Sequence, residues 1–344
     1  MAKCRERLHI LFLAGICHLS LHNYHEAEAC FGGCLPLQAN SHLAWYRRGL
    51  CRLKLKDYDG ARKDFEHVVR LKPDFNAALV GRALALDGQG RWQEAVADLT
   101  QAIDEGFPET RLFFMRSRIC TQLGESANAA RDRQEGLNRD PVDAASWVAR
   151  GVARLADNPE NALADFREAI RVNPHEFEAY RNIAHVLSER LNQPQEAIDT
   201  LDRVLAMTAD DPLTWSGRGV LHARLGHCAA ALADADQAVA VRRDPLVLYQ
   251  VACVHSLCAG SAGTIGPAIA GSKADKLLKT VLPLLAEAFR LDSGLARIAT
   301  DDDDLKNVHG YQPFQQLVTA AEILRLARDP GAIPAVSPAR GQPD

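Results

Sequence analysis

Residues 42–75 show a hydrophobic pattern that predicts a pair of helices, and the rest of the chain is built on copies of this pair. Trp45, Gly49 and Leu53 recur every four residues, which places them on one face of a first helix. Apolar residues recur at the same spacing in a second segment, which ends at Pro73 because proline cannot continue a helix. A single pair cannot bury its apolar faces alone and needs neighbours of the same kind.

The chain supplies these neighbours, since the pattern recurs seven times in phase between residues 8 and 245. The eighth position of each copy is Gly, Ala or Ser, so the two helices can cross closely. Most copies are 34 residues long; the fifth is one residue shorter and the sixth one residue longer. The predicted units are 8–41, 42–75, 76–109, 110–143, 144–176, 177–211 and 212–245.

These recurring residues resemble the tetratricopeptide repeat family, whose pattern is W-x-x-L-G-x-x-Y followed by A, F, A and P. Trp45, Gly49, Ala61, Phe65 and Pro73 match it, whereas the leucine before the glycine is mostly arginine here and the tyrosine is absent. The resemblance implies an all-α fold, a right-handed solenoid (superhelix) of antiparallel helix pairs. We expect seven to eight units plus a C-terminal capping region, with the first helix of each pair lining a concave groove.

Beyond residue 245 the pattern degrades. Residues 246–328 are predicted to contain a degenerate eighth unit, a flexible loop at 259–272 and C-terminal capping helices, and residues 329–344 a disordered tail. The acidic run at 301–304 is interpreted as a solvated helix start, because carboxylates favour a helix N-terminus.

A narrower resemblance covers about the last hundred residues. The order YQVACVHSL, KLLKTVLPLLAEAFRLD and DDDLKNVHGYQPFQQLV is similar to the close of repeat arrays appended to bacterial serine/threonine protein kinases. It implies a capping role and raises the alternative that this chain is the regulatory tail of such a kinase. The chain itself has no glycine-rich loop, H-R-D or D-F-G motif. Because the array begins in register at Leu8, we expect a longer natural polypeptide or a stand-alone relative.

Composition and charge exclude several classes of partner. The net charge of −4 carries no basic excess, so we expect no nucleic-acid binding. The nine cysteines are odd in number and form no C-x-x-C, which favours reduced, buried thiols. The apolar N-terminal run is interrupted by His9 and His18 and is too short to span a bilayer. We therefore expect a cytoplasmic protein without a membrane partner.

No motif for catalysis is present, so we expect neither an enzyme nor a cofactor. Neither H-E-x-x-H nor G-x-S-x-G occurs. His18, His22 and His25 with Cys30 and Cys34 could be imagined as a metal site. Ordinary structural roles are favoured, because the histidines and cysteines fall on different segments of the first unit.

Function is expected in the groove, which positions 2, 5, 9, 12 and 13 of each unit face in this family. The early units offer apolar side chains and the middle units basic ones, which suits a peptide with hydrophobic anchors and an acidic or carboxylate end. The alternative is that positions 5 and 9 only pack neighbouring helices. The candidate partner-binding residues are Phe12, Tyr46, Leu50, Arg111, Phe114, Arg118, Arg181 and His185.

The sequence therefore predicts a non-catalytic scaffold that binds a protein or peptide. Besides the kinase tail, an array that self-associates through its uncapped first unit is an alternative. Leu8, Leu11, Phe12 and Leu19 of that unit are predicted to be partly uncovered, and such apolar patches mark interfaces.

Oppositely charged residues also recur together at two fixed positions of the repeat. Position 7 is arginine and position 23 is aspartate in the same five units, and both are lost together in the first and sixth. This pattern predicts a salt bridge inside each of the five units, near the helix crossing, although the arginines could instead reach into the groove and bind an acidic ligand. The predicted pairs are Arg48–Asp64, Arg82–Asp98, Arg116–Asp132, Arg150–Asp165 and Arg218–Asp234.

Overall fold

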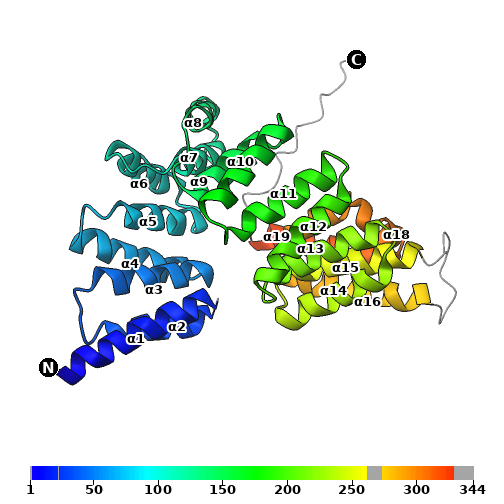
Figure 1. Ribbon diagram of the computed structural model, residues 1–344, viewed down its shortest axis with the longest axis horizontal. Coiled ribbons are helices and arrows are strands. Elements are labelled where there is room, and N and C mark those ends of the chain that lie inside the picture. Colours follow the sequence, from blue (N-terminus) through cyan, green and yellow to red (C-terminus); the bar gives the residue numbers. More distant parts are fainter. Residues whose placement is uncertain (1, 22, 262–272, 329–344) are drawn as a thin grey trace, which may run out of the picture. The chain divides into compact units, whose positions relative to one another are not determined.

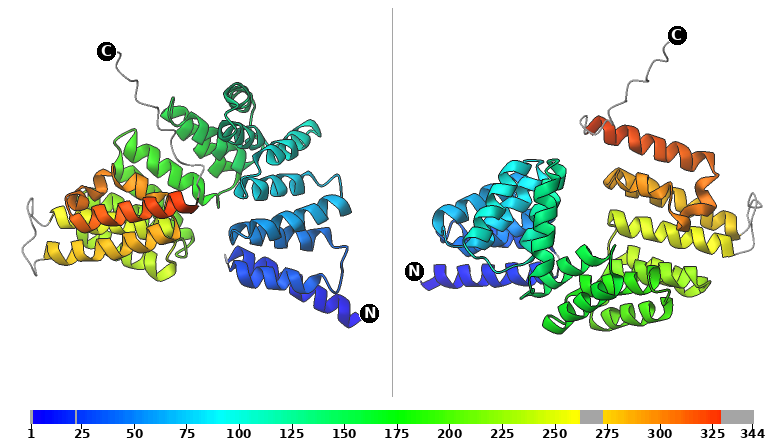
Figure 2. Two further views of the ribbon diagram at one scale, coloured as in Figure 1. Left: turned by 180° about the vertical axis from the view of Figure 1, so that it is seen from behind. Right: turned by 90° about the horizontal axis from the view of Figure 1, so that it is seen from above.

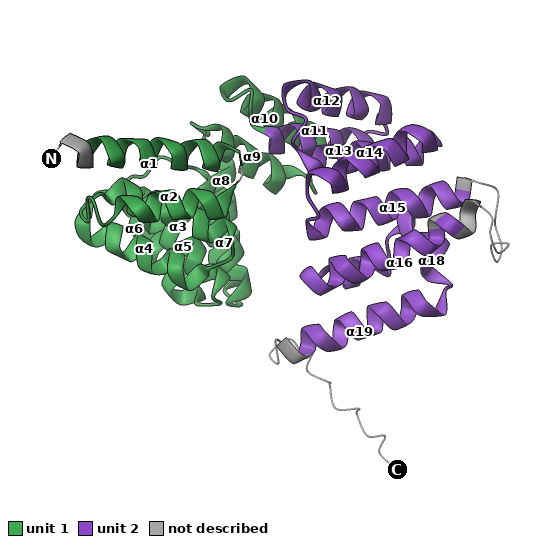
Figure 3. Ribbon diagram, turned by 90° about the horizontal axis from the view of Figure 1, so that it is seen from below, with its two compact units in different colours: residues 1–176 green, residues 177–344 purple. Residues whose placement is uncertain are grey.

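The fold is all-α, and it is built from antiparallel helix pairs. The computed structural model describes residues 2–21, 23–261 and 273–328, and helices are the only regular elements within those ranges. The chain divides into two compact units, residues 1–176 and 177–344 (Figure 3). The boundary falls where the fifth repeat of the sequence ends and the sixth begins.

In the first unit, helix pairs follow one another in chain order, and the second helix of each pair packs on the first helix of the next (Figure 1). The pairs are α1 (Ala2–Ser20) with α2 (Tyr24–Cys34), α3 (His42–Lys54) with α4 (Tyr58–Leu71), α5 (Asn76–Gly88) with α6 (Trp92–Asp104), α7 (Arg111–Gln122) with α8 (Ser126–Asn138), and α9 (Ala144–Arg154) with α10 (Pro159–Val172).

The second unit continues the pairing and then departs from it. Its pairs are α11 (Phe177–Glu189) with α12 (Pro194–Met207), α13 (Pro212–Arg224) with α14 (Cys228–Val241), and α15 (Pro245–Ser261) with α16 (Lys273–Leu291). The short elements α17 (Leu295–Ala299), η1 (Asp303–Leu305) and α18 (Lys306–His309) follow, and α19 (Gln312–Arg328) packs on α16 and α17 (Figure 2).

In the α3–α4 pair, the close crossing depends on a glycine facing an aromatic ring. The Phe65 ring occupies the space in which side chains on Gly49 and Gly81 would lie, since a Cβ atom there would be 2.9 and 2.6 Å from the ring. Phe65 is fully buried as a result. Gly49 at position 8 and Gly81 at position 6 of the next repeat therefore let one phenylalanine fill the gap between two successive pairs.

The turn between paired helices contains a residue in the left-handed backbone conformation. Gly90, Gly124 and Gly226 have φ angles of 72°, 77° and 79°, and Lys56 occupies the equivalent place with φ 61°. Glycine adopts this conformation without the steric cost that a side chain adds. In the fifth repeat, which is one residue shorter, no described residue of the turn has a positive φ.

Two details differ from the sequence predictions. The loop predicted at 259–272 starts too early, because α15 continues to Ser261 and buries Cys258 and Ala259, each 2% exposed, in the core of the second unit. The rest of that loop, and the tail predicted at 329–344, lie outside the described residues.

The four apolar side chains of the first repeat that are predicted to be partly uncovered are so in the structure. Leu8, Leu11, Phe12 and Leu19 are half-buried against residues of α2 and the segment that follows it. Ile10 (59%) and Leu13 (47%) are the more exposed side chains of α1. Self-association through this helix stays a prediction. Over the described part of the chain, no helix combines the length and the apolar character that crossing a bilayer requires.

Candidate binding groove of the second unit

A cavity of about 270 Å³ lies within the second unit, lined by successive first helices. Helices α11, α13 and α15 provide its walls, and the segment around η1 closes one end. Leu213, Val220 and Leu246 give it an apolar side, on which Leu246 remains 44% exposed. The rest of the lining carries charged groups. We call this cavity with its lining the second-unit groove.

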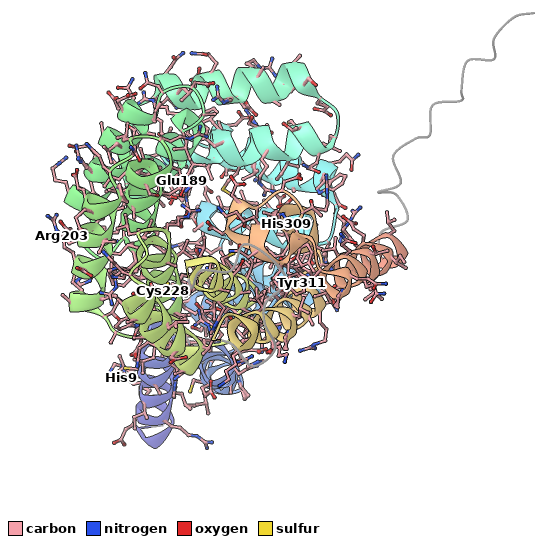
Figure 4. All side chains as sticks on the ribbon, turned by 90° about the vertical axis from the view of Figure 1, so that its right-hand side faces the viewer. His9, Glu189, Arg203, Cys228, His309 and Tyr311 are labelled. Atoms are coloured by element: carbon pink, nitrogen blue, oxygen red, sulfur yellow. The ribbon has the colours of Figure 1, made fainter. Side chains whose placement is uncertain are left out.

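Arg224, in the last turn of α13, organises the charged side. Its guanidinium donates two hydrogen bonds to Asp304, with Nε–Oδ1 2.9 Å and Nη2–Oδ2 2.8 Å, and it also pairs with Glu189 of α11, which Figure 4 labels. Burial alone would lower the pKa of Arg224, but the bonds and charges of Asp304 and Glu189 raise it. Burial raises the pKa of Asp304, and Arg224 opposes this shift.

A second group of polar side chains lies beside this pair. The Tyr249 hydroxyl donates to Asp302 Oδ2 at 2.6 Å, and the backbone N–H of Asp304 donates to Asp302 Oδ1 at 2.9 Å. The Cys253 thiol lies 3.9 Å from the same Oδ2. The interpretation of 301–304 as a solvated helix start is therefore wrong for Asp304, which is 7% exposed. Leu305 and Val308 enter the core next to it and carry this segment inward.

Ligand atoms of Cys253, Asp302 and Asp304 lie within 4.8 Å of one another, a spacing that a metal ion could bridge. The existing contacts do not favour this. Arg224 engages both oxygens of Asp304, and burial together with the two carboxylates raises the pKa of the Cys253 thiol well above its ordinary value. A thiol that keeps its proton is a poor ligand, because metals bind the thiolate.

The two predicted residues in this groove, Arg181 and His185, both lie on α11 and line the cavity. Arg181 Nη1 pairs with Asp211 Oδ2 at 2.5 Å. Burial lowers the pKa of His185, with Arg190 and Arg224 adding to the effect and Glu189 opposing it. His185 is therefore uncharged at neutral pH.

The other predicted basic residues, both in the first unit, also have carboxylate partners. Arg111 lies 2.5 Å from Glu109, and Arg118 lies 2.5 Å from Asp87. Arg118 is 55% exposed, so its pair faces solvent. A ligand carboxylate would therefore have to compete with Glu109 for Arg111 and with Asp87 for Arg118.

The predicted apolar residues of the first unit are half-buried between helices. Phe12 packs edge-on against Phe31, and Tyr46 against Phe65 and Phe75. Leu50 belongs to the cluster around Phe65. Phe114 fills the space beside Gly136, where a Cβ atom would be 2.7 Å from its ring. Contacts of this kind correspond to the packing alternative for positions 5 and 9.

The arginines at position 7 contact the aspartates at position 23 in all five repeats in which both occur. Asp64, at 1% exposure, and its four equivalents are almost fully buried, and several of the arginines also stack on the aromatic ring at position 4. The nitrogen–oxygen distances are 2.6 Å for Arg48–Asp64, 2.7 Å for Arg82–Asp98, 2.7 Å for Arg116–Asp132, 2.9 Å for Arg150–Asp165 and 2.6 Å for Arg218–Asp234.

Sequence reasoning missed Arg224, Tyr249, Asp302 and Asp304. Arg224 occupies position 13 of its unit, one of the positions that face the groove in this family, and that position alone was a signal for it. Asp302 and Asp304 lie 80 residues or nearly so from Arg224, and no repeat period connects them to it.

Three stretches of the chain match family models described as tetratricopeptide repeat, at residues 42–75, 80–137 and 153–221. Human tetratricopeptide repeat protein 6 is 23% identical over 209 residues, which are 60% of this chain and 40% of that protein. Mouse peptidyl-prolyl cis-trans isomerase FKBP4 is 35% identical over 78 residues, 21% of this chain and 17% of that protein.

Among solved structures, a tetratricopeptide repeat protein from Parabacteroides merdae is 17% identical and covers 82% of this chain and 99% of its own, with a TM-score of 0.46. The chain spans two fifths or less of the length of the curated relatives described above.

Proposed function

Because the chain belongs to the tetratricopeptide repeat family, we propose that it is a non-catalytic scaffold that binds a segment of a partner protein in the second-unit groove. The cavity between α11, α13 and α15 supports this proposal. Its volume of about 270 Å³ accommodates one or two side chains of an extended or helical segment rather than a folded domain.

The lining has the composition of a recognition site. An exposed leucine and buried apolar neighbours provide area for an anchor side chain, and the charged groups around Arg224 fix its orientation. In the first unit, a partner-binding role of Arg111 and Arg118 is a separate prediction, while the apolar candidates contribute mainly to helix packing. A partner role for those residues, and the resemblance to a kinase tail, stay predictions.

A side chain added at Gly217 tests the groove directly. Gly217 lines the cavity, and a Cβ atom there would have only Leu201 Cδ1 nearby, at 3.9 Å. Gly217→Leu should therefore fill the cavity without disturbing α13, since leucine also favours a helix more than glycine does. Gly310→Leu is the matched control, because a Cβ atom there meets nothing within 4 Å and the residue does not line the cavity.

Peptides would first be selected on the full chain from a random library displayed on phage, and their affinities then measured by fluorescence anisotropy. We expect Gly217→Leu to weaken binding by about ten-fold or more, and Gly310→Leu to bind like the parent. Selected peptides that bind the parent and Gly217→Leu equally would contradict the proposal, as would a library that yields no binder.

A further inference from the structure

More negative than positive charges face the second-unit groove. Arg181 is held by Asp211, and Arg224 by Asp304. Glu189 shares Arg224 with Asp304, and its side chain is 36% exposed. Asp302 accepts hydrogen bonds from Tyr249 and a backbone N–H, which are neutral donors, and no described cation pairs with it. Glu189 and Asp302 are therefore negative charges in excess of the available arginines.

This arrangement disfavours an acidic ligand. A ligand carboxylate would compete for Arg224 with Glu189 and with Asp304, which holds the guanidinium through two hydrogen bonds and is 7% exposed. It would also approach Glu189 and Asp302, and like charges brought together at an interface are penalised. The neutral state of His185 adds no positive charge to offset them.

The apolar lining of the groove further restricts which class of partner side chain can bind. Val220 and Leu221, one helical turn before Arg224 on α13, line the same cavity as Glu189 and Asp302. A side chain that satisfies both sides needs an apolar stem and a cationic head. Lysine and arginine have this construction, because their methylene stems pack on apolar surface while the charged end contacts carboxylates.

We infer that the second-unit groove binds a lysine or arginine side chain of the partner segment, with its stem on Val220 and Leu221 and its head at the carboxylates of Glu189 and Asp302. This inference rests on the proposed function of the groove and assigns the class of its ligand. It replaces the sequence-based expectation of an acidic peptide end for this part of the chain.

The test uses the peptides selected on the full chain whose binding Gly217→Leu weakens by about ten-fold or more. We expect these peptides to be enriched in lysine and arginine over the starting library. Glu189→Gln and Asp302→Asn should each weaken their binding by about three- to ten-fold, and so should replacement of the peptide's basic residue by norleucine. Glu178→Gln, an exposed residue of α11 outside the cavity, is the matched control.

The outcomes separate the two proposals. Groove-dependent peptides that are enriched in aspartate or glutamate, or that bind Glu189→Gln like the parent, would overturn the cationic assignment and leave the groove intact. Absence of any groove-dependent peptide would overturn both. Glu189 is partly exposed, so Glu189→Gln preserves the fold even where Asp302→Asn does not, and circular dichroism of each variant checks this.

Discussion

Arginine and aspartate meet both in the repeats and in the second-unit groove, but their surroundings differ. In the repeats, Asp165 is 3% exposed and contacts two arginines of its own helix pair, Arg150 and Arg154, so the charges are enclosed. In the groove, Arg224 is 37% exposed and shared by two carboxylates from different elements. Enclosed pairs hold the helices at a fixed crossing, whereas the open cluster retains charge that a partner can use.

The largest effect should come from breaking an enclosed pair. Asp165→Ala leaves Arg150, whose side chain is 8% exposed, with only the exposed Asp140 carboxylate at 3.5 Å, and we expect a loss of about 3–5 kcal/mol in unfolding free energy. Denaturant unfolding followed by circular dichroism measures it. Asp157→Ala removes a carboxylate that is 71% exposed and paired with Arg133, and should change stability by about 0.5 kcal/mol or less. Equal losses in the two variants would contradict the distinction.

Breaking the open cluster should cost less. In Asp304→Ala, Arg224 keeps Glu189 and reaches solvent through the cavity, so we expect a loss of about 1–2 kcal/mol. The same denaturant titration measures this value beside that of Asp165→Ala. A loss as large as that of Asp165→Ala would show that the Arg224 cluster stabilises the fold as strongly as the enclosed pairs of the repeats do.

Acid should destabilise the groove through His185. Burial lowers the pKa of His185 in the folded state, so the unfolded chain, with a histidine pKa near 6.5, binds the proton more readily. The contribution to stability is therefore present above pH 6.5 and is lost as pH falls through 6.5 toward the lowered pKa.

We expect the parent to lose stability through this group between neutral and mildly acidic pH, and His185→Gln to lose less. His222 and His255 have pKa values lowered by burial in the same way and provide the residual slope. Denaturant midpoints measured across this range test the prediction, which parallel pH curves for parent and variant would refute.

The smallest effect concerns the turn of the second repeat. Lys56 adopts φ 61° where other repeats have glycine, so Lys56→Gly removes the cost of a side chain in the left-handed region. Glycine also makes the unfolded chain more flexible, which offsets part of the gain. We expect a net stabilisation of about 0.5 kcal/mol by thermal or denaturant unfolding. Destabilisation would mean that the Lys56 side chain makes a favourable contact in this turn.

Periodicity explains which features the sequence could predict. The helix pairs, their small residues at position 8 and the opposition of positions 7 and 23 all repeat, so each unit serves as a comparison for the others. Arg48 and Asp64 could be paired on this basis without coordinates. Arg224 and Asp304 could not, because their contact occurs once and joins a repeat to a segment outside the pattern.

Local signals were also ambiguous at the end of the array. Asp302 and Asp304 belong to a run of four aspartates, which read alone indicates a solvated helix start. Their burial depends on Leu305 and Val308 packing in the core of the second unit. Likewise, glycine and serine near residue 260 indicated a loop, whereas burial of Cys258 and Ala259 keeps that turn helical.

The closure of each buried Arg–Asp pair within one repeat bears on how such an array can change length. Contacts that join different repeats, such as Arg118–Asp87, Arg218–Asp202 and Arg52–Glu28, each include a side chain that is at least a quarter exposed. Excising or duplicating one of the repeats between residues 42 and 176 would therefore leave no buried Arg–Asp pair without one partner, whereas loss of the seventh repeat would strand Asp304. The array is electrostatically modular, and gene segments encoding whole repeats can be gained or lost with little penalty from the charges that remain.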